Sequence, residues 1–305
     1  MNKFFLILTS LLFVGCATKK PVTWDKRIVN SKIKPLELAY REYGKENNET
    51  ILFIHGFGES KYTWRFIVKP LSKKYHIITI DLKGFGESPK TKDEDYSVYD
   101  QAKIVQKFIE NKKIKNLTII GRSFGGGVAL VLAMMQEEKM LNFKIDKLIL
   151  LDTMSYKQVL PSMMRFLQKP IIGYLGLHLL SAKKIAKEAY EFAFSNDKLI
   201  PKESVEESAK LISMPNAKYA YKQTVDYLVP DDIAKIEKRY KNIKIPTLII
   251  WGKNDVSIPY GFGFKLHRDI KNSNLVIIKG VGHMPQEEAP KTVVKLIDKF
   301  LSAKE

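Results

Sequence analysis

Short apolar runs and longer amphipathic runs alternate along most of the chain. Six runs of four or five residues, rich in isoleucine, leucine, valine and threonine, have the length and composition of buried strands. They are residues 50–54, 76–80, 117–120, 147–151, 247–251 and 275–278. Helical patterns lie between them, at residues 62–71, 96–110 and 128–135. Such alternation predicts an α/β fold with a mostly parallel, doubly wound sheet that carries helices on both faces.

The alternation is interrupted between residues 153 and 242, where the sequence has no strand pattern. Helical runs there are separated by prolines, which break helices. The prolines are Pro161, Pro170, Pro201, Pro215 and Pro230. We therefore expect a helical cap at residues 153–242, inserted between two strands of a core that comprises residues 17–152 and 243–305.

The composition fits a globular protein with a basic surface. Hydrophobic residues make up 45% of the 305 positions, which is enough for a packed core. The formal net charge is +18, but only seven of the 51 basic residues are arginines and the lysines are scattered. Nucleic-acid readers favour arginine forks, so we predict no nucleic-acid partner. A solvated lysine surface, or attraction to an anionic membrane, explains the charge.

The first sixteen residues have the pattern of an export signal. Lys3 precedes an apolar run at residues 4–14, which is too short to span a bilayer but suits a signal peptide. Gly15 and Cys16 follow, and Cys16 is the only cysteine, so it has no disulfide partner. This arrangement resembles the lipobox of bacterial lipoproteins, in which the cysteine is acylated and becomes the first mature residue.

That resemblance implies a location for the protein. Residues 1–16 would be a lipoprotein signal, Cys16 would carry the lipid, and residues 19–25 would form a polar tether. Since no aspartate follows Cys16, we expect the periplasmic face of the outer membrane in a bacterial cell envelope. A plain secretory signal cleaved elsewhere, or an uncleaved anchor, is the alternative.

A serine stands at the junction between a predicted strand and a predicted helix. The stretch "TIIGRSFGGGVAL" contains G-x-S-x-G at residues 121–125, with Ser123 at its centre. In a nucleophile elbow the strained turn exposes the serine hydroxyl above the sheet, and flanking glycines avoid collisions with strand and helix. The pattern therefore predicts that Ser123 is a nucleophile, rather than an incidental serine in a tight turn.

A serine nucleophile needs a histidine base and a carboxylate that orients it. Asp255 follows the strand at 247–251, and His283 follows the strand at 275–278, so both lie at strand ends. Asp152, which ends the strand at 147–151, is a second candidate for the acid. We favour Asp255 and expect Asp152 to bind backbone where the cap begins.

Five motifs in order resemble the α/β-hydrolase superfamily over nearly the whole mature chain. They are "FIHGFGES" at 53–60, "DLKGFGES" at 81–88, "GRSFG" at 121–125, "WGKNDVSIP" at 251–259 and "GHMPQEEAP" at 282–290. The resemblance implies a Ser123–Asp255–His283 triad, and an oxyanion hole formed by the backbone N–H groups of Phe57 and Phe124. It also implies that His55 supports the oxyanion loop and is not the base.

The same residues exclude several chemistries. Epoxide hydrolases and haloalkane dehalogenases of this superfamily need a carboxylate where Ser123 stands. No cysteine, histidine and carboxylate group has metal-ligand spacing, and neither glycine-rich "GFGES" segment is followed by the lysine of a phosphate loop. We therefore expect no metal and no cofactor.

The sequence favours a serine hydrolase of carboxylic esters that acts through an acyl-enzyme intermediate. Cap methionines and aromatics would either line an apolar substrate pocket or form the core of the cap. They are Met154, Met163, Met164, Phe166, Tyr174, Phe192, Phe194 and Met214. We expect a small or medium apolar acyl group. A meta-cleavage-type C–C hydrolase and a serine peptidase are alternatives on the same fold, and a non-catalytic binding protein is an alternative of another class.

Overall fold

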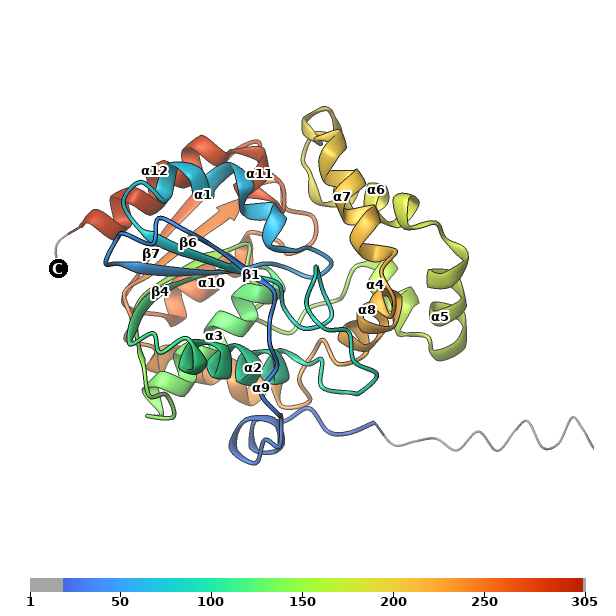
Figure 1. Cartoon of the computed structure of the whole chain (residues 1–305), viewed down its shortest axis with the longest axis horizontal. Coiled ribbons are helices and arrows are strands. Elements are labelled where there is room, and N and C mark those ends of the chain that lie inside the picture. Colours follow the sequence, from blue (N-terminus) through green and yellow to red (C-terminus); the bar gives the residue numbers. More distant parts are fainter. Residues whose placement is uncertain (1–18, 304–305) are drawn as a thin grey trace, which may run out of the picture.

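One seven-stranded sheet forms the centre of the molecule (Figure 1). The computed structural model describes residues 19–303. The strands are β1 (Tyr40–Tyr43), β2 (Thr50–Ile54), β3 (His76–Ile80), β4 (Asn116–Arg122), β5 (Lys144–Leu151), β6 (Thr247–Gly252) and β7 (Ser273–Ile278). Their order is β1-β3-β2-β4-β5-β6-β7, and every neighbouring pair except β1 with β3 is parallel. The predicted fold class is confirmed.

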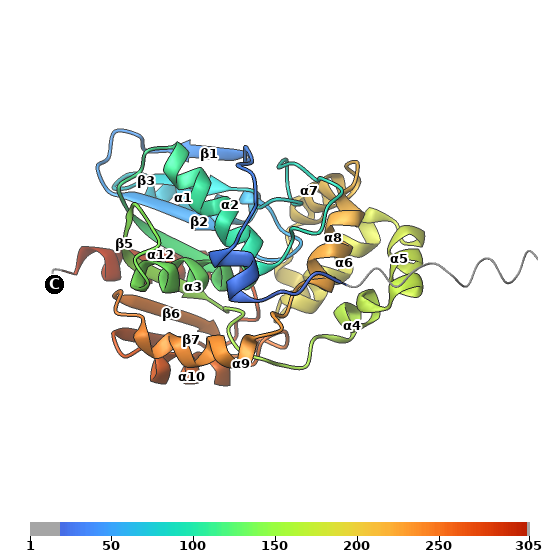
Figure 2. The same ribbon diagram turned by 90° about the horizontal axis from the view of Figure 1, so that it is seen from below.

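Helices cover both faces of the sheet because alternate strand residues point to opposite sides. Ile51 and Phe53 pack with α1 (Arg65–Leu71) and α12 (Pro290–Ser302) on one face. Leu52 and Ile54 belong to the core on the other face. That face carries α2 (Val98–Asn111), α3 (Phe124–Glu137), α9 (Ile233–Ile236) and α10 (Gly261–Asp269), as Figures 1 and 2 show.

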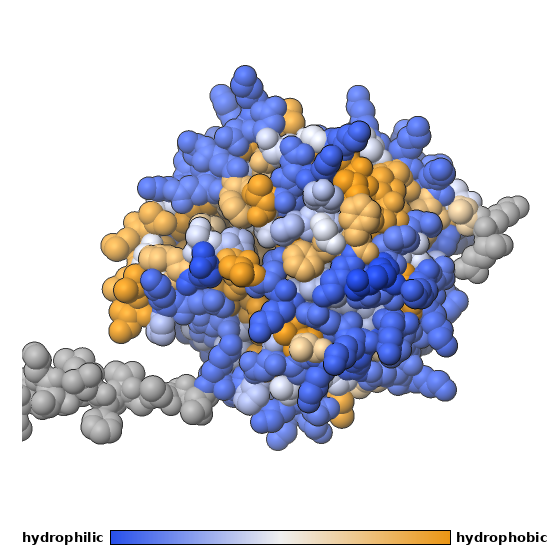
Figure 3. All heavy atoms as spheres, turned by 180° about the vertical axis from the view of Figure 1, so that it is seen from behind, coloured by the Kyte–Doolittle hydropathy of each residue, from blue (hydrophilic) through white to orange (hydrophobic). Residues whose placement is uncertain are grey.

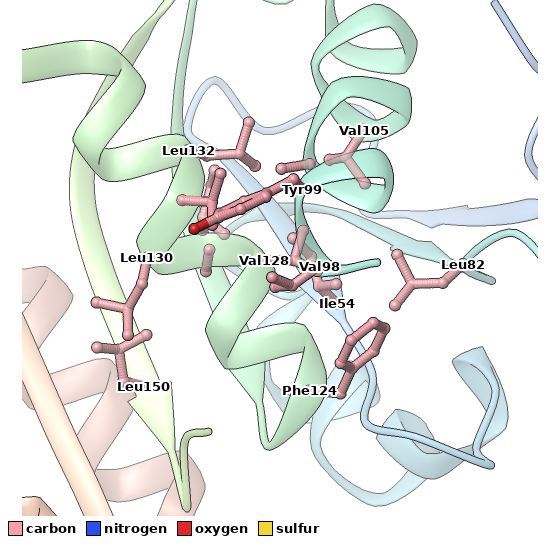
Figure 4. Packing of buried hydrophobic residues seen from close by; sticks show 14 of the residues in the cluster. Ile54, Leu82, Val98, Tyr99, Val105, Phe124, Val128, Leu130, Leu132 and Leu150 are labelled. Atoms are coloured by element: carbon pink, nitrogen blue, oxygen red, sulfur yellow. The ribbon is translucent and has the colours of Figure 1, made fainter. Parts of the chain in front are cut away.

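Helix α3 is the most completely buried helix of this second face. All its residues from Phe124 to Met135 are buried, so the helix is apolar on every side. Val128 lies beside Val98 of α2 and Ile54 of β2, and Leu130 lies beside Leu150 of β5 (Figure 4). This packing fixes the N-terminal end of α3, where Ser123 lies, relative to the strands.

The cap lies between β5 and β6 and contains helices but no strand among the described residues. Its longer helices are α4 (Ser162–Gln168), α5 (Pro170–Leu179), α6 (Ala182–Ala193), α7 (Lys202–Ile212) and α8 (Ala217–Asp226). In Figures 1 and 2 they form a separate layer beyond the carboxyl ends of the parallel strands. The cap therefore lies over the edge of the sheet where the predicted site residues are.

Two features differ from the sequence predictions. Strand β1 has no counterpart in the predicted set, because its four residues are mostly polar and partly exposed. Residues 19–25 do not form a free tether, since Val22 and Trp24 are buried and their N–H groups donate to Asp231 (2.8 Å) and Asp232 (2.7 Å). The chain therefore joins the folded body from Lys19 onward.

The predicted signal, 1–16, and Cys16 lie outside the described residues. Within residues 19–303, helices both long enough and apolar enough to cross a membrane do not occur.

Candidate active site

Ser123 lies in a tight turn between β4 and α3. Its backbone adopts φ 52° and ψ −118°, a combination that non-glycine residues seldom take. A Cβ atom would lie 2.5 Å from the Gly125 carbonyl oxygen if placed on Gly121, and 2.3 Å from the His55 carbonyl oxygen if placed on Gly125. Both glycines are therefore required for the close approach of strand and helix, as the sequence predicts.

The structure brings Ser123, His283 and Asp255 into one hydrogen-bonded row. His283 Nε2 lies 3.0 Å from Ser123 Oγ, and His283 Nδ1 donates to Asp255 Oδ2 at 2.7 Å. The other carboxylate oxygen of Asp255 accepts from the N–H groups of Ser257 (2.8 Å) and Ile258 (2.9 Å). These contacts hold the imidazole with Nε2 free to accept the serine proton.

Their positions follow from the topology. Asp255 and His283 stand in the loops after β6 and β7, which are neighbours in the sheet, so both loops emerge at the same edge. Burial works to raise the pKa of the Asp255 carboxyl, but His283, the Ile258 N–H and Asp152 together outweigh burial and lower that pKa. Asp255 is therefore an ionised partner for the imidazole.

Asp152 is fully buried beside this row but does not hydrogen-bond to His283. Its Oδ1 accepts from the Gly252 N–H at 2.9 Å, and its carboxyl group lies in hydrogen-bonding contact with the carboxyl group of Asp255. Burial, together with the neighbouring Asp255 carboxylate, raises the pKa of Asp152 well above its usual range. Asp152, at the start of the cap, binds backbone as predicted, and its raised pKa favours the protonated form of its carboxyl group.

Asp152, Asp255 and His283 also form the one group of potential metal ligands close together within residues 19–303, with their ligand atoms within 4.8 Å of one another. His283 Nδ1 is already engaged by Asp255. The group is therefore better explained as an acid–histidine pair with a buried neighbour.

The oxyanion loop follows β2. Within the described part of the chain, the N–H groups of Phe57 and Phe124 donate to no protein acceptor, so both are available to a ligand. His55 is fully buried; its Nδ1–H donates to the Gly56 carbonyl at 2.7 Å, and its Nε2 accepts from the Leu82 N–H at 2.9 Å. Burial lowers the pKa of His55 to about 4. It supports the loop, as predicted, and both of its ring nitrogens bond to backbone groups instead of Ser123.

A cavity of about 600 Å³ opens onto Ser123 and His283 beneath the cap. Met163, Met164, Phe166 and Phe192 contribute to its wall, whereas the predicted alternatives Tyr174, Phe194 and Met214 do not. Leu177, Leu180 and Ile185 add further apolar surface. The cavity can hold a small or medium apolar group next to the serine hydroxyl.

The cap rests directly on the loop that carries His283. The His283 N–H donates to the Ala193 carbonyl at the end of α6 (2.7 Å), and the Ser195 N–H donates to Glu288 Oε2 (2.8 Å). Glu288 Oε1 accepts from the Gly282 N–H at 2.9 Å. Glu288, a residue of the "GHMPQEEAP" motif, therefore joins cap and histidine loop.

Comparison with known families agrees with this geometry. Residues 49–290 match the family described as the alpha/beta hydrolase fold. This chain belongs to the α/β-hydrolase fold family.

Relatives of this α/β hydrolase include enzymes with different substrates. Lipase 1 of Psychrobacter immobilis is 27% identical over 302 residues, which cover 93% of this chain and 92% of the relative. Epoxide hydrolase 1 of Caenorhabditis elegans is 27% identical over 328 residues, which cover 98% of this chain and 79% of the relative. The fold is similar to the crystal structure of lip1 from Acinetobacter baumannii AYE, a protein assigned as a lipase, with a TM-score of 0.73 and 31% identity. The match covers 88% of this chain and 89% of lip1. The chain is accordingly a hydrolase.

A buried ion pair that the sequence analysis missed braces the site of this α/β hydrolase. Arg122, the residue before Ser123, donates from Nη1 to Glu59 Oε1 in the oxyanion loop. Glu59 Oε2 accepts from the Gly56 N–H at 3.0 Å. Arg122 also donates to the His283 carbonyl from Nε (3.1 Å) and Nη2 (2.6 Å). One guanidinium thus joins the oxyanion loop, the elbow and the histidine loop.

Replacing this arginine should destabilise the protein. Arg122→Met leaves the Glu59 carboxylate, whose side chain is 10% exposed, without its cation, and such a loss typically costs about 3–5 kcal/mol of unfolding free energy. Urea denaturation measures it. The double variant Arg122→Met/Glu59→Gln should recover part of the loss, and the exposed control Arg41→Met should change little. A cost under about 1 kcal/mol for Arg122→Met would contradict the bracing role.

The pH dependence of activity should report the environment of His283. Burial lowers the pKa of His283 below its ordinary value of 6.5, and Asp255 opposes this shift only in part. Only the neutral imidazole can take the serine proton, so activity disappears as the pH falls through that pKa. We expect the acidic limb of the kcat/KM profile to have its midpoint below pH 6.5. A midpoint above that value would show that the imidazolium is stabilised instead.

Proposed function

We propose that this α/β hydrolase cleaves carboxylic esters with small to medium apolar acyl groups through an acyl-enzyme on Ser123. The observation that carries the proposal is the hydroxyl of Ser123, 3.0 Å from His283 Nε2, at an apolar cavity of about 600 Å³. A serine with a base in reach attacks carbonyl carbon, and the cavity matches the acyl or alcohol portion of an apolar ester.

The reaction would proceed in two halves. His283 takes the Ser123 proton as Oγ attacks the ester carbonyl, and the N–H groups of Phe57 and Phe124 hold the oxyanion. The tetrahedral intermediate collapses, His283 protonates the leaving alcohol, and the acyl group stays on Oγ. Water then attacks the acyl-enzyme with His283 again as the base, and the carboxylic acid leaves. Asp255 stays ionised and stabilises the imidazolium.

The relatives support the ester substrate in part. Psychrobacter Lipase 1 and lip1 carry names that indicate ester hydrolysis. The name of the Caenorhabditis relative indicates epoxide hydrolysis. We assign this chain to the first group because Ser123 occupies the place where an epoxide hydrolase needs a carboxylate nucleophile.

A panel of substrates tests the proposal. We expect hydrolysis of p-nitrophenyl esters from acetate to octanoate, with the highest kcat/KM at an intermediate acyl length. Amino-acid amides test the peptidase alternative, and dienoic diketones test the C–C hydrolase alternative. Faster turnover of either class than of every ester would overturn the assignment to ester hydrolysis.

We propose further that Cys16 is lipidated and anchors the enzyme to the periplasmic face of the outer membrane. The support is the sequence: an apolar run at residues 4–14, then Gly15 and Cys16, with no second cysteine. Lipid chains contribute about 0.8 kcal/mol per buried CH₂, and lysines add attraction to anionic headgroups.

Lipidation predicts a specific labelling result. The full chain expressed in a Gram-negative host should incorporate labelled palmitate and sediment with membranes, and fractionation of the two membranes should place it in the outer one. Cys16→Ser should abolish the label and leave the signal uncleaved, because the acylated cysteine is the processing site. A wild-type chain that is unlabelled, processed and recovered in the soluble periplasm would identify a plain secretory signal instead.

A further inference from the structure

The outward face of cap helix α5 is apolar. Ile171 (73% exposed), Ile172 (57%) and Leu179 (84%) project from this ten-residue helix, together with Tyr174 and Leu175. Figure 3 shows apolar side chains gathered at the end of the molecule that the cap forms. A surface helix normally presents polar residues to water. An exposed apolar face of this size therefore indicates a binding surface for an apolar partner or a membrane.

Helix α5 is apolar on its inner face as well. Gly173 and Leu177 are buried, and a Cβ atom at Gly173 would lie 2.4 Å from the Leu167 carbonyl oxygen of α4. The close packing against α4 fixes which side of α5 faces inward, so Ile171, Ile172 and Leu179 lie on the solvent side. The helix contains no lysine, arginine, aspartate or glutamate. Its exposed face is therefore apolar except for His178, whose ring lies against that of Tyr174.

The chain segment that contains this face carries charges of one sign, and the first acidic residues after it, Glu188 and Glu191, pair with Lys184 and Lys187. Residues 153–187, which include α4 and α5, contain six lysines and arginines and no acidic residue. Arg165, Lys169 and Lys183 are exposed and form no ion pair with any residue in the described range 19–303. Apolar side chains with unpaired cations on the adjoining segments complement an anionic lipid surface, which offers acyl chains below a layer of negative headgroups.

The same helices border the catalytic cavity. Gly176 and Leu177 of α5, Phe166 of α4 and Leu180 line the cavity that reaches Ser123. The chain also enters the folded body at the cap, where Lys19 donates to the Asp226 carbonyl and lies 4.6 Å from the Tyr227 ring centre. Asp226 ends α8, which packs against α5. An anchor on the preceding residues would thus hold the cap side near a membrane.

We propose that the outward face of α5 docks onto an anionic lipid bilayer and admits bilayer-dissolved acyl esters to the cavity. The docking face comprises Ile171, Ile172, Tyr174, Leu175 and Leu179, with Arg165, Lys169 and Lys183 on the headgroups. The entry of ester from the lipid phase rests on the proposed function, whereas docking itself does not.

Tryptophan quenching tests the docking in the full chain. Leu175→Trp and Phe264→Trp place a probe at equally exposed positions, 52% and 53%, on α5 and on core helix α10. The native tryptophans Trp24, Trp64 and Trp251 are buried and give a constant background. Vesicles of phosphatidylglycerol and phosphatidylcholine in equal parts carry bromine near the top of the acyl chains. Because interfacial helices sink only about 5–10 Å, these bromines should quench the α5 probe and spare the α10 probe.

Both variants share the same N-terminus, so an anchor at residues 1–18 attaches them to vesicles to the same extent, but only docking of α5 inserts a probe below the headgroups, where the bromines lie. Equal quenching of the two probes, or none at either, would overturn the docking proposal. A dimer formed through α5 would also overturn the proposal. Sedimentation would then show a dimer mass for wild type and a monomer mass for Ile171→Ser/Leu179→Ser, and the α5 probe would stay unquenched.

Activity separates this proposal from the assignment of the reaction. Ile171→Ser/Leu179→Ser, neither residue lining the cavity, should hydrolyse soluble p-nitrophenyl butyrate like wild type. It should lose about tenfold on a long-chain ester dissolved in the vesicles, the factor expected for 1.4 kcal/mol of lost surface binding. The core control Phe264→Ser should retain both activities. Failure of wild type on every soluble ester would refute the proposed function, whereas equal activity of all variants on vesicles would refute delivery through α5.

Discussion

Ser123→Ala should lower kcat for ester hydrolysis by at least about 10⁴-fold, because the acyl-enzyme cannot form without the hydroxyl. The fold should survive the change. Alanine adds no atom to the turn, and the positive φ of 52° strains alanine as it strains serine. The measurement is kcat on the best p-nitrophenyl ester, together with a thermal melt of each protein.

Ser213→Ala is the matched control, since Ser213 is an exposed serine of the cap whose hydroxyl donates to the Ala209 carbonyl of its own helix. It should retain wild-type activity. If Ser123→Ala retains activity within about tenfold of wild type, the nucleophile lies elsewhere and the elbow is only a turn.

Asp255→Asn should reduce kcat by about 10⁴-fold, while Asp152→Asn should reduce it by no more than about tenfold. Asp255 carries the charge that stabilises the imidazolium, and it accepts the His283 Nδ1–H at 2.7 Å. An asparagine there either donates to Nδ1 and selects the wrong tautomer, or leaves the cation uncompensated.

Asp152 differs because burial and the neighbouring Asp255 carboxylate raise its pKa, which favours the protonated form. Asparagine has the same shape and can still accept the Gly252 N–H through its amide oxygen. The pair of variants is thus an internal comparison of two buried aspartates whose carboxylates face each other. A larger loss in Asp152→Asn than in Asp255→Asn would assign the acid to the end of β5.

Much of the core was predictable because its strands are buried on both faces. Such strands read as continuous apolar runs, and the predicted ranges 50–54 and 76–80 coincide with β2 and β3. Strand β1 was not predicted, because an antiparallel edge strand needs no continuous apolar run and "YREY" at Tyr40–Tyr43 has none. The burial of Val22 and Trp24 was not predicted, because these residues bind Asp231 and Asp232, which lie more than two hundred residues away in the sequence.

The site was predictable to the extent that its residues occur in local motifs. Ser123, Asp255 and His283 follow strands of a parallel sheet, so their chain order and topology predict that they converge. No motif rule predicts the Arg122–Glu59 ion pair, because Arg122 occupies a variable position of G-x-S-x-G and Glu59 a variable position of the oxyanion loop. The only signal was two opposite charges in segments expected to meet.

The cap was predictable in kind and not in detail. Proline spacing and the absence of strand patterns indicate short helices. Which methionines reach the cavity depends on how those helices pack, and that packing is set by small contacts such as Gly173 against α4. The sequence could not show that one face of α5 is exposed, because an apolar helix has the same hydrophobic pattern whether that face is exposed or buried.

A fluorophosphonate probe tests most directly the claim that Ser123 is the nucleophile of a serine hydrolase. The probe phosphonylates a serine only where a base activates it and an oxyanion hole accepts the phosphoryl oxygen. Wild-type protein should be labelled stoichiometrically, with mass spectrometry locating the adduct on Ser123, and hydrolysis should stop in proportion. Ser123→Ala should take no label, and Asp255→Asn should be labelled far more slowly. A folded wild-type protein that hydrolyses esters while remaining unlabelled, or that carries the adduct on another residue, would contradict the account.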